Sequence, residues 1–193
     1  GDALVRIQMG DGSWVDAYET NGEIVIAANK AMGPNSFVIL FLSQLAEKTD
    51  NPELKLKYLN SARRAADWMI NNLQIKDPAN KLYGAFYSWY GYSSDAHLNR
   101  RNIDSSKYTK NDGTYTEGNL DAAAALTSLG KALGEQSIQG KYRSAGILAA
   151  KWLIRSTDEG GAWAGDHFVQ GADGKGNPVR IEDHPTNHNL WAV

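Results

Sequence analysis

The sequence predicts an all-α protein built from repeated helical hairpins, with long loops gathered on one face. The first observation is that apolar residues recur at helical spacing in four segments, near residues 35–49, 54–73, 119–133 and 142–153. The second is that the first two segments match the last two without gaps at an offset of 84 residues. Several matches in one ungapped register indicate a structural repeat. The matched residues include Leu42 with Leu126, Tyr58 with Tyr142, and Trp68 with Trp152.

The first hairpin is expected to begin at Asn35, because asparagine is a favourable helix cap. The helix behind it is apolar on every side, which is typical of a helix in a middle layer. It ends near residues 49–52, and the helix that follows has one apolar and one charged face, so we expect it on the outside. Before this hairpin, residues 15–30 predict irregular structure with a short strand pair around a turn at Asn21-Gly22.

The second hairpin has a helix over residues 119–133, a short connector and a helix from 142 to 153. Partial copies stand at both ends of the chain. A Gly-x-aromatic turn occurs at residues 12–14, 84–86 and 161–163, and the stretch Thr-Glu-Gly-Asn-Leu-Asp-Ala at 116–122 recurs as Thr-Asn-His-Asn-Leu-Trp-Ala at 186–192. We therefore expect one domain over residues 1–193 that is a fragment of a larger helical array.

The connectors between hairpins are long and cover residues 75–118 and 157–188. Because antiparallel helices alternate in direction, all long connectors fall at one end of the array. That end also carries the N-termini of the first helices of each hairpin, where free backbone N–H groups favour carboxylates. Residues 83–121 alone hold eight aromatic side chains and several carboxylates. The pattern predicts a binding surface on this face.

Helical hairpins of this size, each followed by a Gly-x-aromatic turn, resemble the six-hairpin (α/α) toroid shared by many glycosidases and some polysaccharide lyases. The most similar parts are residues 116–122 and the Asp-Gly-Ser-Trp at 11–14. The resemblance implies part of an (α/α) toroid with a carbohydrate-handling groove on the long-loop face. A full ring needs about twice this length. Gln8, Gly12 and Trp14 also match the Gln-x-x-x-Gly-x-Trp repeat of triterpene cyclases, but no Asp-rich motif for starting a cation cascade accompanies it.

Composition and charge limit the classes of partner that the protein is expected to bind. A net charge of −2 without a basic run argues against nucleic acid, and the longest apolar run, residues 37–42, is too short to span a membrane. The chain has no cysteine, so a disulfide framework and thiolate metal sites are excluded and the compartment stays open. We favour a secreted, periplasmic or cell-surface location over the cytoplasm. The expected partner is a carbohydrate, with further repeats or another chain completing the toroid.

No cofactor or metal is expected. His184 and His188 are four residues apart, but Pro185 argues against a helix that would bring them together. Residues 170–177 superficially suggest a calcium loop, yet Lys175 stands where an oxygen ligand is required. A hairpin tip is the preferred interpretation of that segment.

Glu117 and Asp121 are the leading catalytic candidates. If both lie on the second hairpin's first helix, they share one face at its start, where one carboxylate can raise the pKa of the other and create an acid and a base. Glycoside hydrolysis needs that division of roles. The alternative is that both only complement the helix dipole. Asp121 also aligns with Phe37 and Trp191, so that a charge replaces a packing residue.

The connectors supply the other candidates. We expect a second carboxylate across the groove from Asp95, Asp166 or Asp183. Rings suited to stacking on sugars are Trp89, Tyr90, Tyr92 and Trp163, unless the loop buries its own rings. Further substrate contacts are expected from His97, Arg100, His184 and His188.

The predicted function is glycoside hydrolysis of a polysaccharide or oligosaccharide by carboxylate acid/base catalysis. Two alternatives stay open. One is a noncatalytic glycan-binding or surface module. The other is a polysaccharide lyase or epimerase, which would use Tyr108 or His97 as a base beside Arg100 or Arg101.

Overall fold

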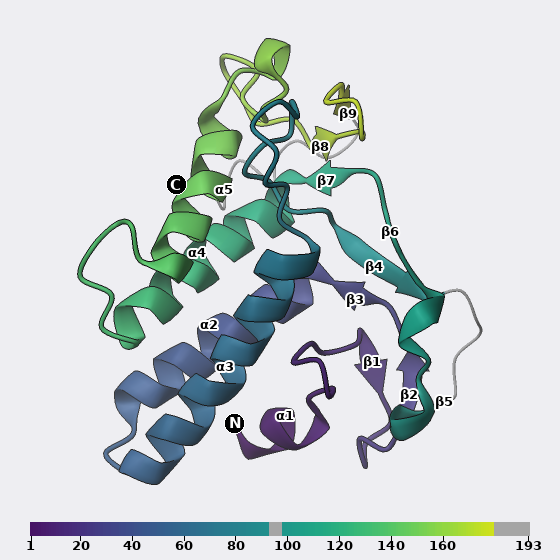
Figure 1. Cartoon of the computed structure of the whole chain (residues 1–193), viewed down its shortest axis with the longest axis vertical. Coiled ribbons are helices and arrows are strands. Elements are labelled where there is room, and N and C mark those ends of the chain that lie inside the picture. The colour runs from purple at the N-terminus through teal and green to yellow at the C-terminus, as the bar shows by residue number, and fades with distance from the viewer. Residues whose placement is uncertain (93–97, 180–193) are drawn as a thin grey trace.

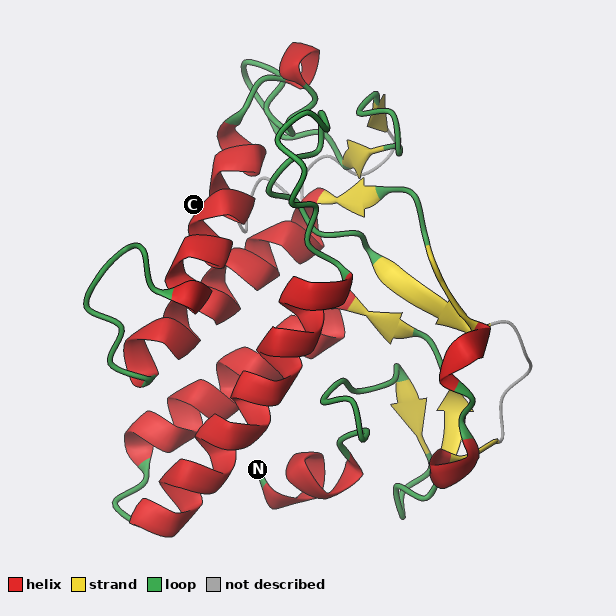
Figure 2. Ribbon diagram, viewed as in Figure 1, coloured by secondary structure: helices red, strands yellow, loops and turns green. Residues whose placement is uncertain are grey.

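The structure is a computed structural model that describes residues 1–92 and 98–179 (Figure 1). The described residues form five α-helices and three small antiparallel sheets (Figure 2). The helices are α1 Asp2–Ile7, α2 Met32–Lys48, α3 Pro52–Asn72, α4 Thr116–Ala132 and α5 Lys141–Ile154. The strands are β1 Ala17–Tyr18, β2 Ile24–Ala27, β3 Lys30–Ala31, β4 Trp89–Tyr92, β5 Leu98–Asn99, β6 Tyr108–Lys110, β7 Thr114–Tyr115, β8 Gly171–Ala172 and β9 Pro178–Val179.

The prediction of an all-α class is wrong, because the described residues are 48% helical and 16% strand, which is a mixed class. The strands lie in the segment between α1 and α2 and in the two long connectors, and these segments run beside one another. Their backbone N–H and C=O groups pair between connectors, because buried backbone groups need partners. The sheets have the orders β1-β2-β5, β3-β4-β6 and β7-β8-β9. The first two join the segment before α2 to the connector between α3 and α4, and the third joins that connector to the one after α5.

The four long helices occur where apolar periodicity predicts them. α2 packs against both α3 and α4, and α4 packs against α5. α2 thus lies between two helices, but the face that carries Phe37 and Phe41 is exposed in the described structure. At the start of α3, the Asn51 side chain accepts hydrogen bonds from the backbone N–H groups of Glu53 and Leu54, and Pro52 opens the helix. Fully buried residues at the centre of the core include Ile39, Leu42, Met69, Leu126 and Leu129.

The Gly-x-aromatic turns bring each connector close to an outer helix. Gly12 and Gly84 have φ angles of +98° and +95°, which non-glycine residues rarely adopt. A Cβ atom at Gly12 would lie 2.6 Å from the backbone oxygen of Arg64, and one at Gly84 would lie 2.6 Å from that of Leu148. Arg64 and Leu148 are 84 residues apart, so the same close approach recurs in the register of the sequence repeat.

Asn35 and Asn119 do not cap their helices, because α2 begins at Met32 and α4 at Thr116. Both asparagines are fully buried and hold the aromatic residue of the preceding turn. Asn35 accepts from the Trp14 backbone N–H at 2.8 Å and donates to the Trp14 carbonyl at 2.9 Å. Asn119 accepts from the Phe86 N–H at 2.8 Å. The asparagine at this repeated position therefore links the turn to the inner helix by side-chain hydrogen bonds to the backbone.

Two shorter expectations are confirmed. Strands β1 and β2 pair antiparallel, with Gly22 at φ +74° in the turn between them. Strands β8 and β9 form the expected hairpin, and its tip is closed by Asp173, whose carboxylate accepts from the backbone N–H groups of Lys175 and Asn177. Within the described ranges, no helix is long and apolar enough to cross a membrane.

Candidate active site

A cavity of about 400 Å³ lies where α2 and α4 begin, beside strands β3, β4 and β7. We call it the inner cavity. Its position follows from the repeat, because residues 37 and 121 are equivalent on neighbouring inner helices and both line it. The lining comprises Ala31, Met32, Gly33, Pro34, Phe37, Ser88, Trp89, Tyr115, Glu117, Gly118, Asp121 and Gln170.

Two glycines set the position of the carboxylates. A Cβ atom on Gly118 would lie 2.4 Å from the Met32 Cε, so glycine allows the start of α4 to approach α2 closely. A Cβ atom on Gly33 would lie 3.5 Å from Asp121 Oδ2, which places the Asp121 carboxyl against the start of α2. Glu117 lies four residues before Asp121, in the first turn of α4.

Asp121 is partly buried while Glu117 is exposed. Burial, and then the negative charge of Glu117, raise the pKa of Asp121 to about 7. A carboxyl group with this pKa still carries its proton in weakly acidic solution, where an ordinary aspartate is ionised. Asp121 is therefore the member of the pair that is suited to donate a proton near neutral pH.

We expect this pKa to make stability depend on pH. The folded pKa lies above the ordinary value of 3.8, so the folded state binds the proton more tightly than the unfolded state. Between about pH 4 and 7 the free energy of unfolding should fall by about 1–2 kcal/mol from this group, after allowance for solvent screening. Asp121→Asn should remove that slope. Urea unfolding of both proteins from pH 4.5 to 8 tests it, and identical slopes would contradict it.

Trp89 and Tyr115 form one aromatic wall of the inner cavity. Their rings are stacked, with centroids 5.9 Å apart and planes at 26°, and the residues are 37% and 39% exposed. Trp89 pairs with Ala31 across strands β3 and β4, and both side chains reach the cavity. An exposed pair of rings beside carboxyl groups suits the apolar face and hydroxyl rim of a sugar.

Tyr90 and Tyr92 do not line the inner cavity. Tyr90 packs edge-on against Trp68 at 6.3 Å and stacks on Tyr108 at 6.1 Å. The Tyr92 ring lies 4.8 Å from that of Tyr108. Side chains alternate along a strand, so these tyrosines support the sheet that carries Trp89.

The remaining predicted site residues are dispersed. Trp163 packs edge-on against Phe168 at 4.9 Å, and Asp166 lies 2.5 Å from the Nδ1 atom of His167, both outside the inner cavity. Arg100 lines a different cavity and donates to the carbonyl oxygen of Arg6 at 2.6 Å. Five predicted residues lie outside the described ranges: Asp95, His97, Asp183, His184 and His188.

Three residues of the inner cavity were missed as candidates. Phe37, interpreted from the sequence as a packing residue, is 48% exposed and lines the cavity, because this face of α2 is not covered in the described structure. Tyr115 could have been found, since it directly precedes the Thr-Glu-Gly-Asn stretch. Gln170 has a buried Oε1 atom that finds no hydrogen-bond partner among residues 1–92 and 98–179, and it also lines the cavity, but nothing in the sequence marks it.

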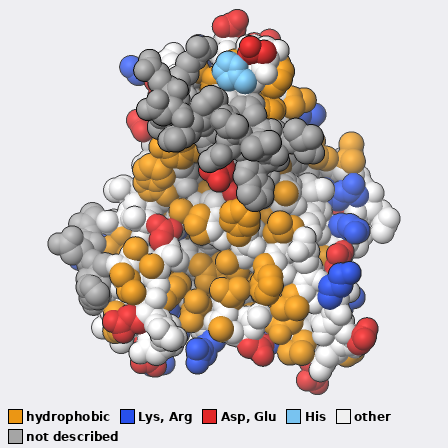
Figure 3. Space-filling view, turned by 180° about the vertical axis from the view of Figure 1, so that it is seen from behind, with side chains coloured by type: hydrophobic (Ala, Val, Ile, Leu, Met, Phe, Trp, Pro, Cys, Tyr) orange, Lys and Arg blue, Asp and Glu red, His pale blue; other side chains and the backbone are white. Residues whose placement is uncertain are grey.

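Exposed hydrophobic side chains continue along α2. Phe41 lies one turn beyond Phe37 and is 46% exposed. The face of the molecule seen from behind is rich in such side chains (Figure 3). The inner cavity therefore opens beside an apolar helix face.

The arrangement of helices and connectors is similar to solved (α/α) toroid proteins. A cellobiose 2-epimerase from Spirochaeta thermophila matches 92% of this chain with 13% identity and a TM-score of 0.61, and a sugar epimerase from a ruminal bacterium matches 92% with 14% identity and 0.62. The family 8 endoglucanase Cel10 from Klebsiella pneumoniae matches 89% with 16% identity and 0.52. The chain spans 37%, 38% and 44% of these proteins, respectively.

The described part of the chain thus has the fold of part of an (α/α) toroid. No protein-family model matches the sequence, and the search of curated proteins found no match.

Proposed function

We propose that the protein is carbohydrate-active and contributes to a glycoside hydrolase site at the inner cavity. The observation that carries this proposal is the pKa of Asp121, raised to about 7 beside Glu117 in a cavity walled by stacked aromatic rings. An acid of this strength can protonate a leaving glycosidic oxygen near neutral pH. The similar toroid proteins, which are sugar epimerases and endoglucanases by name, add support for a saccharide substrate.

In the proposed reaction Asp121 is the proton donor. Burial, and then the negative charge of Glu117 on the same helix face, raise the pKa of the Asp121 carboxyl and so favour its protonated form. Hydrolysis also needs a carboxylate on the opposite side of the scissile bond, to activate water or to attack the sugar. Two carboxylates four apart on one helix face lie on the same side of a ligand. We therefore assign the second role to a residue across the groove. Of the three candidates from the sequence, Asp166 lies outside the inner cavity, and Asp95 and Asp183 lie outside the described residues.

Trp89→Ala should weaken saccharide binding about tenfold, because it removes half of the stacked pair with Tyr115. The effect should fall on KM rather than kcat, since the ring holds the sugar in both ground and transition states. Trp163→Ala is the matched control, because Trp163 packs on Phe168 outside the inner cavity. Equal losses in the two variants, measured by calorimetry or steady-state kinetics, would remove Trp89 from the site.

The function itself is tested with a panel of polysaccharides and oligosaccharides. New reducing ends indicate hydrolysis, an ultraviolet-absorbing product indicates a lyase, and binding without turnover indicates a glycan-binding module. The panel should be used with this chain and with any longer chain that contains it. Absence of new reducing ends from every substrate and both proteins would refute the hydrolase proposal.

Epimerisation is the second candidate, because the two epimerases match this chain with higher TM-scores than the endoglucanase does. In that reaction a base removes a proton beside the reducing-end carbonyl and returns it to the other face. Chain length stays constant, so chromatography that resolves epimers separates this outcome from hydrolysis.

A further inference from the structure

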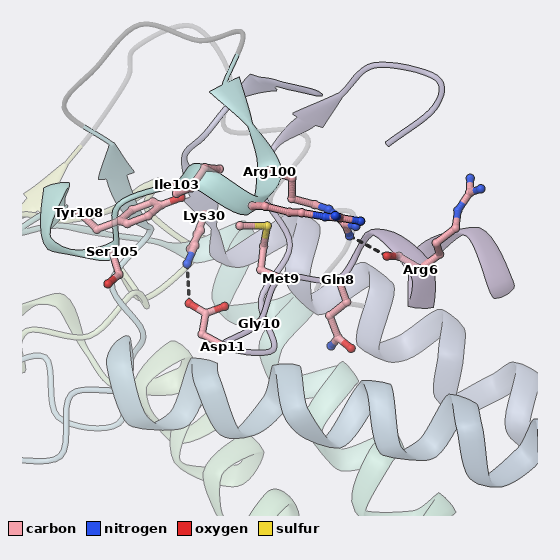
Figure 4. A pocket seen from close by; sticks show the side chains of 11 residues that line it. Arg6, Gln8, Met9, Gly10, Asp11, Lys30, Arg100, Ile103, Ser105 and Tyr108 are labelled. Atoms are coloured by element: carbon pink, nitrogen blue, oxygen red, sulfur yellow. Dashed lines mark hydrogen bonds and ion pairs between the residues drawn. The ribbon is translucent and has the colours of Figure 1, made fainter. Parts of the chain in front are cut away.

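A second and larger cavity, of about 620 Å³, lies between the segment that follows α1 and the connector around residues 100–108 (Figure 4). We call it the outer cavity. Lys30, Arg100, Arg101 and Tyr108 line it together with Asp11. None of these five residues lines the inner cavity.

The sheet β3-β4-β6 separates the two cavities. Lys30 lines the outer cavity, and the next residue, Ala31, lines the inner one. Successive side chains on a strand point to opposite faces of the sheet. A ligand in the outer cavity therefore contacts a different surface from a ligand held by Trp89 and Asp121.

The outer cavity is strongly cationic in a chain whose net charge is −2. Its lining carries four basic side chains, with Arg6 at the rim, against one carboxylate. Lys30 is neutralised within the protein: it is buried, its Nζ atom lies 2.5 Å from Asp11 Oδ2, and it lies 4.3 Å from the centroid of the Tyr108 ring. The positive charge left for a ligand is that of the arginines.

Arg100 and Arg101 are positioned differently. The Nη1 atom of Arg100 donates to the carbonyl oxygen of Arg6 at 2.6 Å, which fixes its guanidinium at the cavity (Figure 4). Among the described residues, the other N–H groups of this guanidinium form no hydrogen bond. The Arg101 side chain is exposed and, within the described residues, makes no hydrogen bond or ion pair. Glu23 shares an adjoining depression with both arginines but forms no ion pair with either within 4.0 Å in the described structure.

We propose that the outer cavity binds an acidic saccharide, one whose sugar rings carry carboxylate or sulfate groups. A guanidinium group presents paired donors that match the two oxygens of such a group, and Arg is preferred over Lys where this geometry matters. The Ile103 and Met9 side chains in the lining add apolar surface for a sugar ring. The inference that the ligand carries an oxyanion depends on the arginines. The inference that the ligand is a saccharide depends on the proposed function.

Calorimetric titration of the full chain with three probes tests the proposal: an oligogalacturonate, a sulfated glycosaminoglycan oligosaccharide and a neutral cello-oligosaccharide. At least one acidic probe should bind at least about tenfold more tightly than the neutral one, and more weakly as salt rises. The preferred acidic probe identifies the group as carboxylate or sulfate. Arg101→Gln should weaken acidic binding about tenfold, because a charge-assisted hydrogen bond is lost.

Arg63→Gln is the matched control, since Arg63 is an exposed arginine of α3 that lines neither cavity. Asp121→Asn should leave acidic binding at the outer cavity intact. Equal affinities for acidic and neutral probes, or equal losses in the Arg101 and Arg63 variants, would overturn the proposal. Acidic binding that depends on Arg101 in a protein without any glycoside turnover would support this inference while refuting the hydrolase.

Discussion

Asp121→Asn is expected to reduce glycoside turnover by about 10²- to 10⁴-fold, the usual range for the loss of a general acid. The amide has nearly the same shape as the protonated carboxyl group but cannot release a proton. Substrate affinity should change little, because the aromatic wall of Trp89 and Tyr115 is left intact. The measurement is kcat and KM on whichever substrate the glycan panel identifies. Asp112→Asn, at an exposed position on the same connector, is the control and should retain full activity.

Substrates with an activated leaving group sharpen this test. Such a leaving group departs without a proton, so Asp121→Asn should lose much less activity on them than on natural glycosides. A uniform loss on both substrate types would show that Asp121 does not act as the proton donor. Loss of less than tenfold on natural glycosides would remove it from the mechanism.

Asn119→Ala is expected to cost about 3 kcal/mol of stability, the largest effect that we expect from a single polar residue. The fully buried Asn119 side chain accepts from the Phe86 N–H and donates to Thr114 Oγ1 at 2.6 Å and to the Tyr115 carbonyl at 2.8 Å. Alanine would remove the acceptor of the buried Phe86 N–H and one of the hydrogen bonds of Thr114 Oγ1, which would still donate to the Phe86 carbonyl oxygen. Urea unfolding measures the loss.

Asn71→Ala, at an exposed position on α3, is the control and should change stability by less than about 0.5 kcal/mol. Asn35→Ala should behave like Asn119→Ala, because Asn35 holds Trp14 in the equivalent way. A cost below about 1 kcal/mol for both buried asparagines would contradict their role as ties between connector and helix.

The helices could be predicted from the sequence because their signals are local. The 3.6-residue period of the apolar residues and the 84-residue offset can both be recognised in the sequence without knowledge of any long-range contact. The local strand pairs β1–β2 and β8–β9 could be predicted from their turn residues. The pairings between distant segments, such as Lys30 with Tyr90, could not. The strands are two to four residues long, too short for a period of two to stand out from the aromatic composition.

Site residues could likewise be predicted where local spacing fixes their position, and not where long-range packing does. Glu117 and Asp121 share a helix, so their spacing fixes their common face, and both line the inner cavity. The sequence could not show that Trp89 lines the inner cavity and Tyr90 does not. The sheet face on which each ring lies depends on how strand β4 pairs with β3 and β6. Phe37 was interpreted as a packing residue because exposure of a helix face depends on which elements cover it.

The most direct test of the account is the titration of the Asp121 carboxyl carbon by NMR, in the wild-type protein and in Glu117→Gln. It needs no substrate and reports on the group that carries the proposed chemistry. We expect a pKa of about 7 in the wild type and a lower value in Glu117→Gln, since the neighbouring charge is removed while burial remains. An Asp121 pKa close to 3.8 in the wild-type protein would contradict the account.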